Sequence, residues 1–407
     1  MNPAFTAPQL KSFLSLFQQH GMKLVQKWKD DIASSDSPVE GVMINTATWF
    51  SRVTLDIIGL AGFNYEFGAI ENSKNEISEV YKNLFLDSTL YPSKLDTLFR
   101  AFWRYIPEEP LHLIRFLPTK EYKRFLQYSN VMRRLAPRII RRNEASGNGK
   151  DIVSVLARAN ETLDPKARLS DVEVCDQIST LLLAGHDTTA NTLMWFFYEI
   201  SKSPEWQGKV RAELAAARAR VVERGDEDFS IADLEGMSIM HACLKESMRL
   251  HPIVFRLLRE AAQDDVLPLA FPITTKTGEQ ISQIPVQKGQ PVTISIAGYN
   301  RLEAVWGADP HGFHPERFLE MDKAKQASVG VYANLLNFSA GLRACIGWRF
   351  SVIELQALTA MLLENFEFAF PEGAERKKIV RKPAGLMLPV VEGYHGSWMG
   401  LRVRALQ

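Results

Sequence analysis

The chain begins as a series of segments in which apolar residues recur at helical spacing. Residues 10–28 and 49–60 show this pattern, and a Gly/Asn break at 62–64 follows the second of them. A strongly basic segment, 122–143, and a short one that starts at Asp151 continue the series. The pattern predicts amphipathic or core helices through the first part of the chain.

The longest apolar stretch covers residues 178–200 and is about as long as a membrane span. His186, Asp187 and Asn191 lie in its middle, where ionisable and polar groups would be costly in lipid. We therefore expect a long helix buried inside a protein. A solvated helix rich in Arg, Ala and Glu is expected next, at 205–224.

The pattern changes beyond Pro252. Helical spacing at 239–250 stops at the residue before this proline, where helices usually end. Short runs of β character follow, such as 292–296, together with turn-rich sequence such as 307–315. The last elements expected are one long helix and two strand-like regions, at 348–366, 379–391 and 401–405.

The composition is that of a folded globular protein. Of the 407 residues, 46% are hydrophobic and 23% charged, and 48 Lys and Arg nearly balance 47 Asp and Glu. These values argue against a disordered chain, a collagen-like fibre and a polybasic nucleic-acid-binding protein. The chain also has no internal repeat, low-complexity tract or clear linker. We predict one domain, residues 1–407, that is mainly α with a minor β part.

Cysteine usage and the N-terminal sequence bear on the cellular setting. The chain has only Cys175, Cys243 and Cys345, an odd number that is too small for a disulfide framework and favours a reducing compartment. The first residues lack the charged and apolar regions of a signal peptide, and no early apolar run could span a bilayer. We expect no signal peptide or membrane anchor at the start.

The most informative segment is 338–347, which reads Phe-Ser-Ala-Gly-Leu-Arg-Ala-Cys-Ile-Gly. A thiolate at Cys345 would be favoured by the positive end of the following helix and by Arg343. Gly341 permits a tight turn, and Gly347 leaves room for a flat ligand above the loop. A lone cysteine is more often a small buried hydrophobe, but that reading does not explain these neighbours. We expect Cys345 to be an anionic ligand or a nucleophile.

This segment resembles the cysteine-ligand signature of the cytochrome P-450 family, the haem-thiolate monooxygenases. The matching residues are Phe338, Gly341, Arg343, Cys345 and Gly347. Five fixed positions would match by chance on the order of 10⁻⁴ times in a chain of this length. The resemblance implies a cytochrome P-450 fold, haem bound at these residues, Cys345 as the axial ligand of the iron, and Arg343 paired with a haem propionate.

A second group of polar residues lies within the long apolar stretch, at 184–189, Ala-Gly-His-Asp-Thr-Thr. Gly185 and the threonine hydroxyls can loosen the helical hydrogen bonds, while Asp187 and Thr188 offer an acid and a hydroxyl beside a cavity. Taken alone, such a group is more often a satisfied polar network in the core. Together with the cysteine segment, it resembles the family's oxygen-activation motif. The resemblance implies that Asp187 and Thr188 are catalytic and relay protons, and that His186, at the variable position, is no iron ligand.

A third group is formed by Glu246 and Arg249, which share one helix face at i, i+3. Two fixed residues at this spacing occur by chance about once in roughly 400 positions. Their order along the chain adds weight, because Pro-Glu-Arg-Phe at 315–318 lies between them and the cysteine segment, as in the family. The resemblance implies a structural network of Glu246, Arg249 and Arg317 that holds the cysteine loop in shape.

Residues 252–259 resemble the stretch that passes along the haem edge. The resemblance implies that Arg259 meets a haem propionate and that 253–255 face the substrate, although Arg259 alone could equally be a surface charge. His311 and His314 lie three residues apart, but no further ligands at zinc-like spacing join them, so we expect them on the surface.

The resemblance also implies a reaction. It is the insertion of one oxygen atom from O₂ into a small apolar organic substrate, with haem b as cofactor and electrons from NAD(P)H through an NADPH-cytochrome reductase. Arg343 and Arg349 suggest a basic docking face for this partner. The substrate would lie under an aromatic segment, 85–105, which could equally be core. The motifs are similar to those of fungal microsomal members that act in secondary metabolism or on xenobiotics.

The match to the family begins near Asn2, just after the position of the family's third major helix. The family's front helices, first sheet strands and membrane anchor are therefore expected to be absent, so the fold would be N-terminally truncated. The full-length family is expected on the cytosolic face of the endoplasmic reticulum membrane, whereas this chain alone, without an anchor, could be cytoplasmic. The alternative to an enzyme is a truncated, non-catalytic remnant with impaired haem binding and an exposed core.

Overall fold

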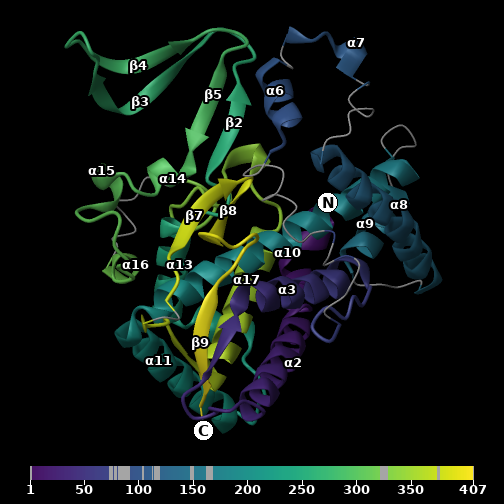
Figure 1. Ribbon diagram of the computed structural model, residues 1–407, viewed down its shortest axis with the longest axis vertical. Coiled ribbons are helices and arrows are strands. Elements are labelled where there is room, and N and C mark those ends of the chain that lie inside the picture. The colour runs from purple at the N-terminus through teal and green to yellow at the C-terminus, as the bar shows by residue number, and fades with distance from the viewer. Residues whose placement is uncertain are drawn as a thin grey trace.

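Helices form most of the body of the molecule, and small antiparallel sheets are attached to it (Figure 1). The computed structural model describes residues 2–72, 77, 80, 92–102, 105–111, 113, 120–146, 151–161, 168–320, 329–373 and 376–406. The prediction of a mainly α chain with a minor β part is confirmed. None of the described helices is both long enough and apolar enough to cross a membrane.

The first elements build one side of the body. They are η1 (Asn2–Phe5), α1 (Ala7–Lys11), α2 (Leu14–Ala33), β1 (Val42–Asn45) and α3 (Thr46–Phe63). Helix α3 is buried along most of its length, and it ends at Asn64, whose φ of 47° is the left-handed conformation of a helix C-terminus. This break agrees with the one expected at 62–64.

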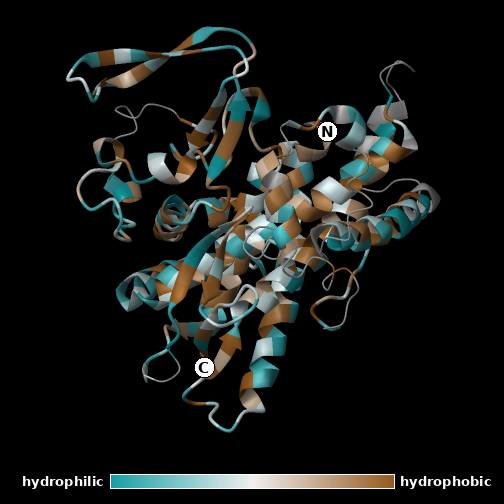
Figure 2. Ribbon diagram, turned by 45° about the horizontal axis from the view of Figure 1, so that its top comes forward, coloured by the Kyte–Doolittle hydropathy of each residue, from teal (hydrophilic) through white to brown (hydrophobic). Residues whose placement is uncertain are grey.

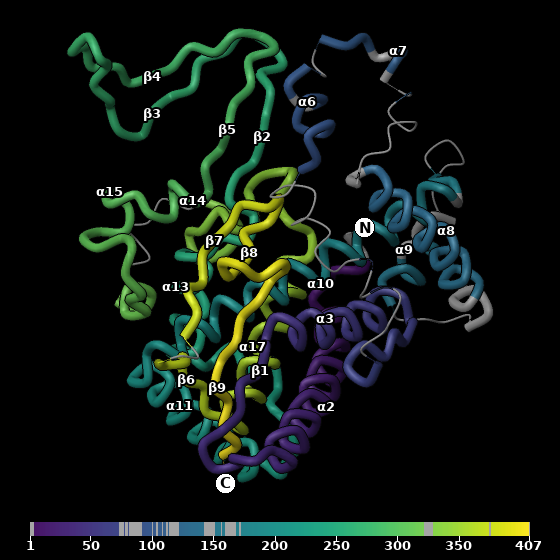
Figure 3. Tube along the Cα trace, in the orientation of Figure 1, coloured from purple at the N-terminus to yellow at the C-terminus, as the bar shows by residue number. Residues whose placement is uncertain are grey.

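The next elements lead to the long central helix. They are α6 (Lys94–Phe102), α7 (Glu108–Leu111), α8 (Lys120–Ser146), α9 (Ile152–Glu161) and α10 (Asp171–Ser201). Helix α10 starts before the expected residue 178, because Ser170 and Glu173 form a reciprocal capping box there. It then runs through the middle of the molecule beside α3 (Figure 3). The expectation of a long helix buried inside the protein is therefore met.

Three further helices follow the central one in the chain. They are α11 (Pro204–Glu223), α12 (Ile231–Glu235) and α13 (Ser238–Leu250). Helix α13 ends before Pro252, as its sequence predicts. Its inner face buries nine of its thirteen residues, including the charged Glu246 and Arg249.

The β-rich part contains a projecting hairpin that the sequence pattern does not predict. Strand β2 (Arg256–Glu260) pairs with β5 (Pro291–Ser295). Between them, β3 (Asp265–Thr274) and β4 (Gln280–Val286) form an exposed hairpin that extends away from the body (Figure 1). The expectation of a strand at 292–296 is met by β5.

The remaining elements return the chain to the core. They are α14 (Ile296–Tyr299), α15 (Glu303–Trp306), α16 (Arg317–Glu320), η6 (Gly341–Arg343), α17 (Trp348–Asn365), β6 (Phe366–Ala369), β7 (Ile379–Ala384), β8 (Leu386–Val391) and β9 (Gly400–Ala405). Strand β9 is the middle strand of a sheet ordered β1-β9-β6, in which Val42 and Phe368 both lie opposite Val403.

Hydrophobic residues concentrate where the helices meet in the middle of the molecule (Figure 2). An aromatic cluster joins α2, α3, α10 and β6 there, formed by Trp28, Phe50, Phe197, Phe366 and Phe368. All five side chains are buried. The cluster therefore links segments from both ends of the chain in one core.

The aromatic segment expected over the substrate is only partly within the described residues. Positions 85–91 and 103–104 lie outside them. Of the residues that are described, Phe102 and Tyr105 are exposed, by 56% and 84%, so neither belongs to the core.

Candidate functional site

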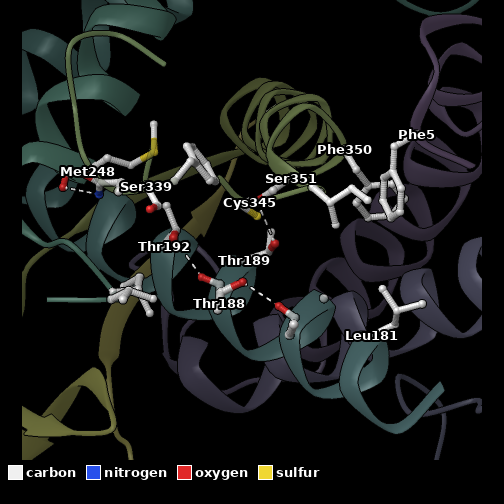
Figure 4. A pocket seen from close by; sticks show the side chains of 18 of the residues that line it. Phe5, Leu181, Thr188, Thr189, Thr192, Met248, Ser339, Cys345, Phe350 and Ser351 are labelled. Atoms are coloured by element: carbon white, nitrogen blue, oxygen red, sulfur yellow. Dashed lines mark hydrogen bonds between the residues drawn. The ribbon is translucent and has the colours of Figure 1, made fainter. Parts of the chain in front are cut away.

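A cavity of about 260 Å³ lies between the middle of α10 and the start of α17 (Figure 4). Most of its wall is apolar, with Ile58, Ile253 and Phe350 among the lining residues. The thiol of Cys345 and the hydroxyls of several α10 and α17 residues interrupt this apolar wall. The site therefore presents one sulfur atom to a concave, mostly apolar space of the kind that binds small molecules and cofactors.

The cysteine loop is shaped by its backbone. Gly341 has a φ of 65°, the left-handed conformation that glycine tolerates best. The Cys345 N–H donates to the Phe338 carbonyl at 2.8 Å, which folds the loop back on itself before α17 begins. Phe338, Arg343, Cys345 and Gly347 all line the cavity, whereas Gly341 shapes the turn behind them.

The electrostatic setting of Cys345 differs from the one expected. Burial of the sulfur among protein atoms raises the pKa of the Cys345 thiol, and the Gly347 N–H opposes this shift. The residue as a whole nevertheless has an exposed surface. The positive helix end and Arg343 were expected to favour the thiolate, but in the chain alone desolvation prevails, since it penalises the charged form.

The cavity fits a flat, largely apolar prosthetic group that carries anionic edges. A Cβ added at Gly347 would meet only Phe5, at 3.8 Å, so the wall above the loop is open. Cys345 offers a soft ligand of the kind that binds haem iron, and the exposed Arg343 offers a cation at the edge.

The segment expected along the haem edge is only partly at the cavity. Ile253 and Val254 line it, but Phe255 does not, and Leu257 takes its place. Arg259 lies on the exposed part of β2, where its guanidinium donates to the Leu258 carbonyl at 2.8 Å. It is outside the cavity wall, two residues beyond Leu257.

The middle of α10 forms the wall opposite the cysteine loop. Its side chains bond back to the helix: the Thr188 hydroxyl donates to the Ala184 carbonyl at 2.7 Å, and the Thr192 hydroxyl to the Thr188 carbonyl at 2.8 Å. Such bonds compete with the helical ladder. Gly185 allows close packing on α3, because a Cβ there would lie 2.7 Å from Ile58.

Asp187 and Thr188 are neighbours in sequence but face different surroundings. Thr188 lines the cavity and Asp187 does not. The Asp187 carboxylate lies 3.2 Å from Nε2 of His186, which is buried, and whose Nδ1 bonds to the Leu182 carbonyl. Burial disfavours the charged form of His186, but the Asp187 carboxylate and the Leu182 carbonyl together oppose it and raise the pKa of the imidazole.

The structure brings Glu246, Arg249 and Arg317 together. Glu246 and Arg249 are both 0% exposed and form a bidentate pair, with two N···O distances of 2.7 Å. Nε of Arg317 lies 3.6 Å from the Glu246 carboxylate. Arg249 also donates to the carbonyls of Asn300, Pro310 and Gly312.

This network reaches the cysteine loop through two asparagines. The Asn300 amide donates to the Asn337 side chain at 2.9 Å, and Asn337 donates to the Met248 carbonyl at 2.8 Å. Asn337 immediately precedes Phe338. The buried ion pair is therefore connected by hydrogen bonds to the segment that carries the cysteine.

Of the two histidines expected on the surface, His311 is exposed and His314 makes local contacts. His314 is paired with Asp309 at 2.8 Å and with Glu316 at 3.1 Å, and its side chain is 39% exposed. Within the described part of the chain, no three His, Cys, Asp or Glu side chains are grouped closely enough to hold a metal ion.

The sequence patterns single out neither Ser351 nor Glu354 near the cavity, and they mark Thr189 only for a hydroxyl that can loosen the helix. Thr189 and Ser351 both line the cavity and lie 3.0 Å apart, oxygen to oxygen (Figure 4). Glu354, one turn beyond Ser351, is 0% exposed. Its signal in the sequence is an acid between the apolar residues Ile353 and Leu355 in the middle of α17, where a buried charge would be expensive.

Comparison with known proteins agrees with this architecture. The family model for Cytochrome P450 matches residues 1–396. The chain is 34% identical to Cytochrome P450 monooxygenase 205 of Postia placenta, over 96% of this chain and 71% of that protein. It is 32% identical to Cytochrome P450 monooxygenase 128 of the same organism and 30% identical to Cytochrome P450 monooxygenase claQ of Ampulloclitocybe clavipes, over 99% and 100% of this chain and 74% of each relative.

The fold and these relatives define the class of the protein, a monooxygenase among the oxidoreductases. The chain belongs to the cytochrome P450 family. Members of this family carry a haem iron, receive electrons from a redox partner and act on apolar substrates.

Proposed function

We propose that this chain inserts one oxygen atom from O₂ into a small apolar organic molecule, as a haem-thiolate monooxygenase of secondary metabolism or xenobiotic oxidation. The observation that supports this most is the position of Cys345, whose thiol lies in an apolar cavity that also contains the Thr188 hydroxyl. A structural cysteine would have no need of a cavity or of a hydroxyl-bearing helix across it.

In this proposal, Cys345 would bind the iron of haem b. Arg343, at the cavity edge, would hold one propionate, and Arg259 on β2 is the candidate for another. The raised pKa of the thiol is compatible with this role, because binding of a metal ion displaces the thiol proton. When bound, the haem supplies the activation of O₂, which no side chain can provide.

The chain's own residues would exclude water and hold protons. The apolar wall keeps the site dry, while Thr188 presents its oxygen to the cavity from a bond to the Ala184 carbonyl. Asp187, paired with His186 behind this wall, would relay protons to Thr188.

A second cavity suggests where the substrate would approach. It has a volume of about 490 Å³ and shares Ala184 and Thr188 with the first. Leu183 and Leu386 contribute apolar surface to it, and Tyr128 contributes a ring. An apolar substrate held there would contact the same part of α10 that the cysteine cavity uses.

The electron donor in this proposal is an NADPH-cytochrome reductase that docks beside the cysteine loop. Arg349 is exposed at the start of α17, and its guanidinium lies 4.5 Å from the centre of the Trp348 ring. Together with Arg343, it gives this face positive charge for an acidic partner.

The test is the absorption spectrum of the purified protein, loaded with haem, reduced and treated with carbon monoxide. We expect the Soret band of thiolate-ligated haem, and we expect Cys345→Ala to abolish it. Cys175→Ser is the matched control, because Cys175 lies outside the cavity wall and its replacement should leave the band in place. A protein that takes up no haem, or a thiolate band that persists in Cys345→Ala, would overturn the proposal.

A further inference from the structure

Trp195 of α10 follows Thr192 of the cavity wall by about one turn, but it lines neither of the two cavities. Its side chain is 2% exposed. The indole is stacked on the imidazole of His251, at the end of α13, with ring centroids 4.2 Å apart and an angle of 5° between the planes. Parallel contact between two buried flat rings restricts the tilt of both.

His251 is itself held by a hydrogen bond. Burial lowers its pKa to about 4, so the imidazole is neutral near neutral pH. The Glu199 carboxylate, which lies 3.6 Å from Nζ of Lys202, can only accept hydrogen bonds, so Nε2 of His251 donates to it at 2.6 Å. With one face on Trp195 and one nitrogen on Glu199, the imidazole is fixed in both tilt and in-plane rotation.

Trp195 also reaches the walls of both cavities, through the backbone of Met387. Its Nε1–H donates to the Met387 carbonyl at 3.3 Å, and the Met387 N–H donates to the Ile253 carbonyl at 2.8 Å. Ile253 lines the cysteine cavity, while Leu386, the residue before Met387 in β8, lines the second cavity. Two apolar wall residues from distant parts of the chain are therefore joined at one backbone link, and Trp195 is bonded to that link.

Core packing alone would account for the indole ring but not for its polar contacts. A side chain that only fills space needs neither a bond from its N–H to Met387 nor a stacking partner held by Glu199. The two explanations differ in what they predict for phenylalanine at this position, which keeps a stacked ring and removes the N–H.

We propose that Trp195, held in place by His251, is a positioning residue that fixes the spacing between Ile253 and Leu386, and with it the shape of apolar molecule that the two cavities accept. The inference rests on the proposed function only for the identity of that molecule as a substrate. The link itself belongs to the chain and can be measured without haem.

The first test is amide hydrogen exchange of the full chain, labelled with isotope at its methionines and followed by NMR near neutral pH. We expect Trp195→Phe to speed exchange of the Met387 amide roughly two- to tenfold, the range that corresponds to one lost hydrogen bond. The Met399 amide, which bonds to the Asn45 side chain, is the internal reference and should not change. Unchanged Met387 exchange, or equal acceleration at Met399, would overturn the inference, because the latter result indicates a loss of stability everywhere.

Tyr198→Phe is the matched control. Tyr198 lies on the same helix with its ring edge-on to the same imidazole, at 6.2 Å, but it makes no bond to Met387. Its replacement should leave the Met387 amide as it is in the unaltered protein. Acceleration equal to that in Trp195→Phe would show that any change beside His251 loosens this region, and would contradict a specific role for the indole N–H.

His251→Gln keeps the test decisive if Trp195→Phe does not fold. Glutamine retains a donor for Glu199 but removes the ring that stacks on Trp195, so we expect faster exchange of the Met387 amide here too. In the double variant the two effects should add to less than their sum, because both act through one link. Unchanged exchange in His251→Gln, or full additivity, would overturn the role of His251.

The second test measures the shape of the cavity in the haem-loaded protein by the binding of N-methylimidazole and N-octylimidazole, followed by the shift of the Soret band. Only the long alkyl chain would reach the walls, so Trp195→Phe should weaken N-octylimidazole roughly two- to tenfold relative to N-methylimidazole, and Tyr198→Phe should not. An unchanged ratio of the two dissociation constants would overturn the role in selecting molecules. A chain that takes up no haem would overturn the proposed function, and the exchange measurement would still decide whether Trp195 holds the link.

Discussion

Replacing Arg249 by methionine tests the buried ion pair that supports the cysteine loop. Methionine has a similar length but removes the charge and every hydrogen bond of the guanidinium. Among the described residues, the Glu246 carboxylate would keep the backbone N–H of His314, at 2.9 Å, and the more distant Arg317, at 3.6 Å. We expect Arg249→Met to lower the free energy of unfolding by about 3–5 kcal/mol, because it leaves a buried charge without its partner.

The size of this effect should depend on burial rather than on the ion pair as such. Arg224 makes a comparable bidentate contact with Asp233, with N···O distances of 2.9 and 2.7 Å, but the Arg224 side chain is 44% exposed. Arg224→Met should therefore cost less, because water reaches this ion pair and the N–H and hydroxyl of Ser230 still donate to the Asp233 carboxylate. Urea unfolding followed by circular dichroism compares the two variants directly.

A double variant separates the lost charge pair from lost packing. In Glu246→Gln/Arg249→Met, no carboxylate remains buried alone, so the double variant should lose less stability than the sum of the two single variants. Additive losses, or equal losses in Arg249→Met and Arg224→Met, would refute the reasoning from burial.

Two further predictions concern α10 and the end of α13. Gly185→Ala should lower the free energy of unfolding by about 1–3 kcal/mol, because its Cβ would lie 2.7 Å from Ile58. Gly208→Ala, at an open position of α11, should raise the free energy of unfolding by up to about 1 kcal/mol. A loss of stability in both variants would contradict this prediction. Burial lowers the pKa of His251 to about 4 from 6.5. The unfolded chain then binds the proton more readily, so stability should fall as pH drops from about 6.5 toward 4. Thermal unfolding of His251→Gln should show a weaker dependence, and the remainder is expected from His241, whose pKa burial also lowers to about 4.

The sequence predicts much of the helical framework, because its apolar spacing is long and regular. It does not predict β1, a strand of four residues whose partner, β9, is near the other end of the chain. It also does not predict the β3–β4 hairpin, since Pro268 and Pro272 interrupt the run and most of β3 is exposed, so no buried face imposes an alternating pattern.

Local motifs predict the cysteine loop and the charged network of Glu246, Arg249 and Arg317, but they do not predict the surroundings of each side chain. Cys345, Thr188 and Arg343 line one cavity, as their motifs suggest. The direction of Asp187 toward His186 and the exposure of Arg259 depend on the packing of neighbouring elements. The sequence does not single out Glu354, because its burial depends on the side chains that surround it, and only a three-dimensional structure shows these.

The position of β9 has a consequence for the synthesis of the protein. As the middle strand between β1 and β6, it supplies the hydrogen-bonding edge for a segment near the start of the chain; next to it, the Thr46 hydroxyl bonds to the Met399 carbonyl, 353 residues away. During translation, β1 can therefore pair with β9 only after the segments between these two strands have left the ribosome. Until then β1 remains unpaired. A chain that stops before β9 would leave β1 and β6 without the strand that joins them.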